Sequence, residues 1–165
     1  AAHAQALAAL RAQDWVEAEL TLEQLVLEYP DYPGPYVNLA LVYLHDGRDG
    51  EARAMLDRAL AVEPSHAAAN TQLGILLRTE GKFDEAEAAY RRALESEPDH
   101  ALAHFNLGVL LDVYLRRPAE ALDHYDQYQA SLGAPDETVG RWIIDLQRRL
   151  GVAASTPSVA QEDGP

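Results

Sequence analysis

The sequence predicts an all-α protein, an α-solenoid of about four helical hairpins followed by a capping helix. The first observation is a constant interval between three prolines, Pro30, Pro64 and Pro98. A period of this length, roughly 34 residues, indicates an array of similar supersecondary units. The second is an abundance of Ala and Leu, which favour helix. The third is the lack of alternating strand patterns between hairpin turns.

Several residue types keep the same interval, and each has a physical role in a helical hairpin. They are Leu39, Leu73 and Leu107; Ala18, Ala52 and Ala86; and Gly47 and Gly81. The glycines fall where a first helix must stop, which suits a left-handed C-terminal cap. The prolines end each second helix, because proline lacks the N–H that would continue it. We therefore expect units at about residues 1–32, 33–66, 67–100 and 101–135.

The third unit carries the fullest motif. Its two helices read Asn70-x-x-Leu73-Gly74-x-x-Leu77 and Ala86-x-x-x-Tyr90, followed by Ala93 and Pro98. This pattern resembles the tetratricopeptide repeat (TPR), and the resemblance covers residues 1 to about 133. It implies a TPR domain at residues 1–150 that binds other proteins. Gly74 is expected where two helices meet, so a larger side chain there should overpack. Ala67 is expected near the surface.

The fourth unit departs from the pattern. Its turn holds Arg116 and Arg117 where Gly is expected, and one extra residue precedes Ala121. Tyr128 occupies the place of a small alanine. We expect its ring to push the following helix outward or to pack on it directly.

A capping helix is expected at residues 136–150, since a terminal repeat needs a cover for its last apolar face. Asp136 can cap its start and Gly151 can end it. Its apolar residues share one face by helical spacing: Val139, Trp142, Ile143, Leu146 and Leu150. Trp142 is therefore expected to pack rather than to bind a ligand. Residues 151–165 are small and polar, and we expect a disordered tail or linker.

The net charge of the protein limits the classes of partner that it is expected to bind. The 27 acidic and 13 basic residues give a net charge of -14. This argues against nucleic acid, whose phosphates need Lys and Arg, and against an anionic bilayer. It favours a basic or neutral partner, although an acidic surface also simply keeps a protein soluble. No apolar run reaches the roughly 18 residues of a membrane span.

Nothing in the sequence indicates an enzyme or a cofactor. There is no cysteine, and the common hydrolase, nucleotide and zinc-protease motifs are absent. His100 and His104 could share a metal at one-turn spacing. However, His66 stands exactly one repeat interval before His100, which indicates a repeat-derived residue and no metal site. His45 and His124 are expected to be ordinary surface or turn residues.

The resemblance implies that the first helix of each unit lines a concave groove. The residues that would line it are Val37, Leu41, Leu44 and His45; Thr71, Ile75, Arg78 and Thr79; and Phe105, Val109 and Asp112. The basic clamp that chaperone-binding relatives use for a carboxylate is largely missing. An apolar groove of this kind suits an amphipathic helix or an apolar extended segment. Leu44 and Val109 could instead pack against neighbouring helices.

We therefore expect a scaffold or adaptor that binds an apolar, amphipathic or basic segment of a partner. The alternative is a self-assembling subunit, a dimer or filament formed by end-to-end stacking of repeats. A third possibility is an enzyme subunit whose active site lies elsewhere. The Arg-rich composition with a single lysine, Lys82, indicates a bacterial protein. The cell envelope or periplasm is slightly favoured over the cytoplasm.

Overall fold

The computed structural model describes residues 2–152. All regular structure in this part of the chain is helical, which confirms the all-α class. The helices are α1 (Ala2–Arg11), α2 (Trp15–Glu28), α3 (Pro33–His45), α4 (Asp49–Val62), α5 (Ala67–Thr79), α6 (Phe83–Ser96), α7 (Ala101–Val109), the π-helix η1 (Leu110–Tyr114), α8 (Pro118–Ala130) and α9 (Glu137–Leu150). Between residues 2 and 152, none of them combines the length and apolar character needed to cross a membrane.

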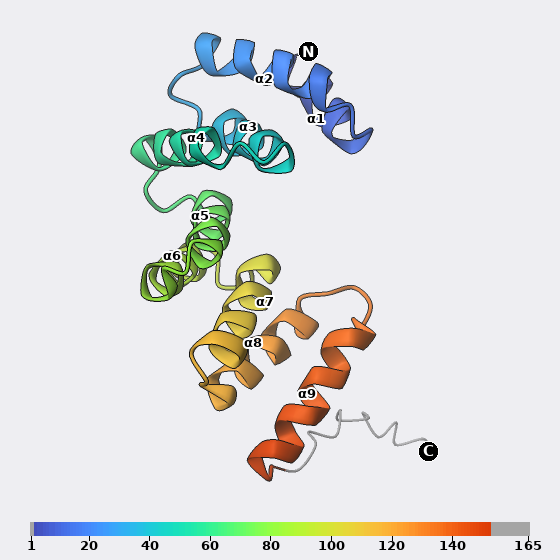
Figure 1. Cartoon of the computed structure of the whole chain (residues 1–165). Coiled ribbons are helices and arrows are strands. Elements are labelled where there is room, and N and C mark those ends of the chain that lie inside the picture. The colour runs from blue at the N-terminus through green and yellow to red at the C-terminus, as the bar shows by residue number, and fades with distance from the viewer. Residues whose placement is uncertain (1, 153–165) are drawn as a thin grey trace, which may run out of the picture.

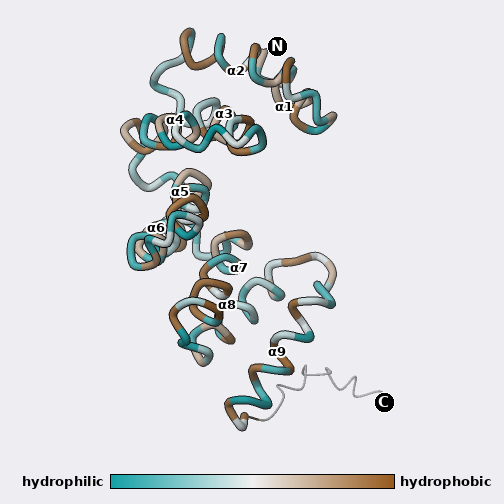
Figure 2. Tube along the Cα trace, in the orientation of Figure 1, coloured by the Kyte–Doolittle hydropathy of each residue, from teal (hydrophilic) through white to brown (hydrophobic). Residues whose placement is uncertain are grey.

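The helices form a curved array of hairpins (Figure 1), with α1 and α2 at one end and α9 at the other. Teal and brown alternate along the trace in Figure 2, so most helices carry both an apolar and a polar side. One buried cluster runs from Ala6 in α1 to Leu146 in α9. Each hairpin thus buries its apolar side against its neighbour, as expected for a solenoid.

Glycine and tyrosine interlock inside the last two hairpins. A Cβ added to Gly74 would lie 2.5 Å from Cε1 of Tyr90, and one added to Gly108 would lie 2.7 Å from Cε1 of Tyr125. The expected close approach at Gly74 is therefore confirmed. The expectation for Ala67 is wrong, because this residue is only 2% exposed. It starts α5 at the junction with the next two helices and packs in a small alanine cluster.

In every hairpin, the turn between the two helices contains one residue in the left-handed backbone conformation. Gly47 and Gly81 have φ values of 71° and 76°, as the spacing predicts. Gln13 and Arg116 take this place in the first and fourth hairpins, with φ values of 57° and 53°. A residue other than glycine adopts this conformation at a steric cost, so the first and fourth hairpins keep the turn although they lack the glycine of the pattern.

The extra residue of the fourth unit is absorbed by a π-helical turn. The Leu115 N–H donates to the Leu110 carbonyl at 3.0 Å, an i→i+5 hydrogen bond. Such single turns occur inside helices and are frequent at functional sites. Because the insertion is taken up here, Ala121 and Tyr125 keep their buried places in α8.

Helix α9 covers the last hairpin. Oδ1 of Asp136 accepts from the N–H groups of Thr138 at 2.9 Å and Val139 at 3.1 Å. Gly151 ends the helix with a φ of 68°. The hydroxyl of Tyr128 donates to Oδ2 of Asp136 at 3.2 Å, so this ring packs against the cap. Of the expected tail, only Gly151 and Val152 belong to the described residues.

Candidate functional site

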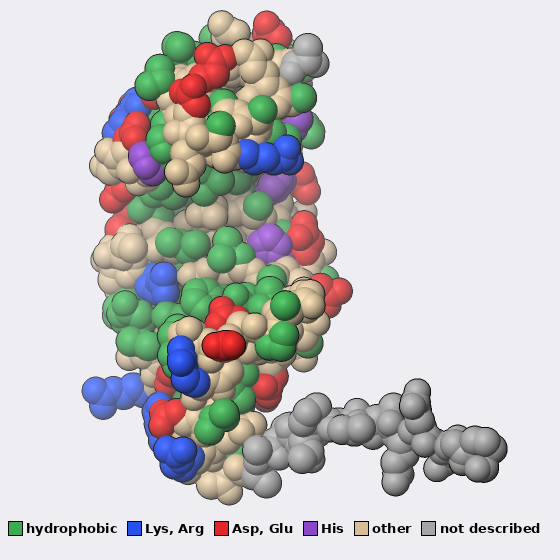
Figure 3. All heavy atoms as spheres, turned by 90° about the vertical axis from the view of Figure 1, so that its right-hand side faces the viewer, with side chains coloured by type: hydrophobic (Ala, Val, Ile, Leu, Met, Phe, Trp, Pro, Cys, Tyr) green, Lys and Arg blue, Asp and Glu red, His purple; other side chains and the backbone are tan. Residues whose placement is uncertain are grey.

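The concave side of the array is formed by the first helices of the hairpins, α1, α3, α5 and α7. It opens toward the right of Figure 1. Figure 3 looks at this side and shows hydrophobic side chains gathered across its middle. This surface is the candidate binding groove.

One row of apolar side chains runs along the groove, with one residue from each hairpin. Its members recur at the repeat interval and are all half-buried: Leu7, Leu41, Ile75 and Val109. We call them the groove row. Leu7 was not among the expected residues, because the first unit keeps only the second half of the motif. Counting one repeat interval back from Leu41 would have found it.

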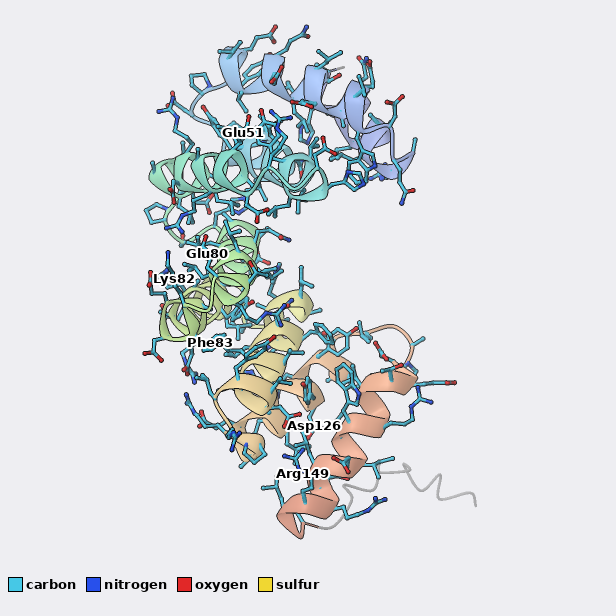
Figure 4. The ribbon with its side chains drawn as sticks, viewed as in Figure 1. Glu51, Glu80, Lys82, Phe83, Asp126 and Arg149 are labelled. Carbon is cyan, nitrogen blue, oxygen red and sulfur yellow. The ribbon has the colours of Figure 1, made fainter. Side chains whose placement is uncertain are left out.

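A second row of side chains lies about one helical turn beyond the groove row. Its residues change from apolar to charged along the groove. Leu10 and Leu44 are apolar, whereas Arg78 and Asp112 are charged, and all four are half-buried. Arg78 makes no ion pair with any residue between 2 and 152. Oδ1 of Asp112 lies 3.5 Å from Nη1 of Arg149, which reaches across from α9 (Figure 4). The groove is therefore apolar in its first half and mixed in its second.

Two of the expected groove residues lie inside the protein. Val37 is 5% exposed and packs in a cluster with Ala59 and Ala69. Thr71 is fully buried, and its hydroxyl donates to the Ala67 carbonyl at 2.9 Å. Both stand near the start of a first helix, where the adjacent hairpin covers them. They stabilise the junctions between hairpins and offer no surface to a partner.

Phe105 occupies the corresponding position in α7 and is half-buried. Its ring centre lies 5.2 Å from that of Tyr128 and 6.1 Å from that of Trp142. It therefore belongs to the packing between α7, α8 and α9. Thr79 is exposed at the end of α5, where its hydroxyl donates to the Leu76 carbonyl at 2.7 Å.

His45 is a surface residue, as expected, and its ring has two partners that the sequence did not indicate. Its ring stacks on Trp15 with centres 3.9 Å apart, and its Nδ1 lies 2.8 Å from Oδ1 of Asp46. Trp15 starts α2, so this stack joins the first two hairpins at the edge of the groove. The side chain of His45 is exposed.

His104, which is buried, and His124, which is half-buried, form a hydrogen-bonded pair. Nε2 of His104 donates to the Pro98 carbonyl at 2.8 Å, so its Nδ1 accepts from Nδ1 of His124 at 2.9 Å. His124 therefore has a partner that the sequence did not indicate. Burial, followed by the proximity of His104 and Arg91, lowers the pKa of His124 to about 4.

The positions of His100 and His104 do not support a metal ion shared by the two rings. Nδ1 of His100 lies 3.0 Å from Oε2 of Glu97, whereas His104 is engaged by Pro98 and His124. The two rings thus serve separate contacts. Over residues 2–152, no group of three or more His, Asp or Glu side chains is arranged to hold a metal ion.

A small cavity lies at the C-terminal end of the groove, beside α9. Its volume is ≈ 200 Å³, and its lining residues are Val109, Asp112, Val113, Tyr125 and Trp142. Pockets for drug-sized ligands start at roughly 300 Å³. This cavity has room for a side chain of a bound segment rather than for a cofactor.

Three family models, each described as a tetratricopeptide repeat, match residues 2–32, 31–96 and 71–135. Together they cover the chain from its first described helix to the turn before α9. Comparison with curated proteins found no match.

Several solved structures are similar in fold. PilF of Pseudomonas aeruginosa is 19% identical with a TM-score of 0.77, over 88% of this chain and 66% of that chain. The TPR protein TTC0263 of Thermus thermophilus is 25% identical with a TM-score of 0.71, over 87% and 78%. An O-GlcNAc transferase of Thermobaculum terrenum is 29% identical with a TM-score of 0.68, over 76% of this chain but only 25% of that chain. These neighbours fit the bacterial type that the composition indicates.

The constant repeat interval, the stacked hairpins and the three matching models agree with one another. Arrays of this kind present extended concave surfaces and serve as scaffolds for protein–protein interaction. The chain belongs to the tetratricopeptide repeat family.

Proposed function

We propose that this protein binds an apolar or amphipathic segment of a partner protein in its concave groove. The observation that carries the proposal is the groove row, in which Leu7, Leu41, Ile75 and Val109 repeat at one position of four successive hairpins. All four are half-buried, so each offers apolar surface while its base is anchored in the array. Covering such a row removes further apolar area from water, which favours binding by roughly 25 cal/mol per Å².

The charged residues of the second row indicate which kind of partner segment the groove would bind. Arg78 is the only basic residue in the two rows, and Asp112 is the only acidic one. A chain terminus held by several basic residues is therefore not the expected ligand. A segment with apolar side chains along one face fits better, because it can follow the groove row through several hairpins.

Two further expectations belong to this proposal. The chain acts as a scaffold and not as an enzyme, which is supported by the lack of catalytic motifs in its sequence. The cell envelope remains the preferred location, and fractionation of cells that produce the untagged protein would test it.

The binding mode can be tested with peptides selected from a random displayed library on the immobilised protein. Hydrogen exchange of the complex would then report which amides the peptide protects. We expect added protection in α3, α5 and α7, whose side chains form the groove. Protection confined to α2, α4 and α6 would contradict the proposal, because these helices form the convex side.

A further inference from the structure

The convex face of the first hairpin differs from that of its neighbours. Val16, Leu20 and Leu27 in α2 are 72%, 55% and 81% exposed. We call these three residues the α2 stripe. The residues one and two repeat intervals later are small or polar: Gly50, Ala54 and Ala61 in α4, and Asp84, Ala88 and Glu95 in α6. Of the first three hairpins, only the first thus has large apolar side chains at these positions.

Stacking of hairpins does not cover this face. The equivalent residues of α4 and α6 are all exposed, although each of those helices has a hairpin before it and another after it. The α2 stripe is therefore a surface that the solenoid leaves open. Tyr29 and Tyr32, which follow α2, are also more than half exposed and extend the apolar area.

The charges around the stripe indicate what would cover it. Glu23 is exposed and lies between Leu20 and Leu27 on the same side of α2, at helical spacings of three and four residues. The helix contains four glutamates and no basic residue; Glu19 is paired with Arg48 of the next hairpin, and Glu23 accepts a hydrogen bond from the hydroxyl of Tyr43 at 3.4 Å. A complementary surface would present an apolar side chain flanked by cations.

Helix α9 presents such a surface at the other end of the molecule. Ile144 is 55% exposed, and Arg141 and Arg148 lie three residues before and four residues after it, on the same side. Nη2 of Arg141 donates to the hydroxyl of Thr138 at 3.3 Å. Within residues 2–152, neither arginine forms an ion pair. This side is opposite to the buried residues that α9 packs against the last hairpin, Val139 and Leu146.

We propose that the outer side of α9 in one copy of this protein docks on the α2 stripe of a second copy. The two surfaces lie at opposite ends of the array (Figure 1), so one molecule cannot satisfy both by itself. The contact joins different patches of two identical chains, which makes it head-to-tail and allows open chains of molecules. It does not involve the concave groove, and it differs from stacking of repeats because α9 already covers the last apolar face.

The first test is sedimentation velocity of the full chain over a wide range of concentrations. We expect the weight-average sedimentation coefficient to rise with concentration. The double variant Leu20→Glu with Leu27→Glu should remain monomeric, with a dissociation constant raised at least tenfold. The matched control, Ala54→Glu with Ala61→Glu, changes the equivalent exposed positions of α4 and should associate like the natural sequence.

The second test uses complementation between two defective variants. The α2 variant above keeps an intact α9, whereas Arg141→Glu with Arg148→Glu keeps an intact α2 stripe. Each should be monomeric alone, and an equimolar mixture should form a dimer that does not grow further. Circular dichroism of each variant would check that the helices are intact, since all four changed residues are exposed.

A monomer at every concentration would overturn the proposal. So would association that persists in both variants, or a mixture of the two that stays monomeric while the natural chain associates. If the natural chain is monomeric but peptides still protect α3, α5 and α7, the groove function stands without self-association.

Discussion

Replacing Gly74 by Ala tests the packing that defines each hairpin. The added Cβ would lie 2.5 Å from Cε1 and 2.7 Å from Cδ1 of Tyr90, distances that side-chain carbons do not tolerate. Tyr90 is fully buried, so its ring has no free space into which to move. Overpacking of this kind costs about 1–3 kcal/mol. The change from Gly to Ala in a helix returns about 1 kcal/mol, which leaves a net loss of up to about 2 kcal/mol.

The matched control is Gly140→Ala in α9. Its added Cβ would meet only Nε2 of Gln129, at an ordinary 3.6 Å, so the gain in helix propensity should dominate and stabilise the protein. Unfolding in urea, followed by circular dichroism, would compare the two variants. For a chain of this size, each kcal/mol corresponds to roughly 2–4 °C in melting temperature. A stabilised Gly74→Ala variant, equal to the control, would refute the packing argument.

Three further predictions address positions outside the groove. Ala67→Leu should destabilise by about 1–3 kcal/mol in urea unfolding, because the alanine cluster at this junction has no room for a larger side chain; an unchanged midpoint would contradict it. Asp136→Ala should cost about 1 kcal/mol through loss of the cap, and Asp136→Asn, which keeps an acceptor, should cost less; equal losses would count against the capping role. His124 takes up a proton near pH 6.5 when unfolded but only near pH 4 when folded, so its contribution to stability is complete above pH 6.5 and is lost as the pH falls toward 4. The loss is at most about 3 kcal/mol, and the pH dependence of the unfolding midpoint should flatten in His124→Gln.

The packing inside the hairpins could be predicted from the sequence because the residues in contact are themselves part of the repeat motif. The small residue at Gly74 and the ring at Tyr90 are both part of the motif, so their contact follows from the period. The left-handed turns at Gly47 and Gly81 follow in the same way, because glycine marks the conformation that the chain needs. In the corresponding turn of the fourth hairpin, Arg116 takes the left-handed position, so no glycine in the sequence indicates this conformation.

The parts that could not be predicted depend on contacts that vary between units. The period cannot show that Val37 and Thr71 are buried, since the curvature of the array decides how far each hairpin covers the next. The His104–His124 pair joins residues from two helices of the irregular fourth hairpin. The π-helical turn explains the extra residue there, but an insertion of one residue fits a longer loop equally well until the structure is known.

The central claim is that the concave groove binds a protein segment, and one double variant tests it most directly. Leu41→Glu with Ile75→Glu places two carboxylates in the groove row, where an unpaired charge in an interface costs several kcal/mol. Affinity for the peptides selected on the natural protein should fall roughly hundredfold or more, since each 1.4 kcal/mol is about tenfold. The matched control, Ala54→Glu with Ala88→Glu, adds the same charges at the same spacing on exposed convex positions and should bind normally. Unchanged affinity in the groove variant, with its helices intact by circular dichroism, would contradict the account.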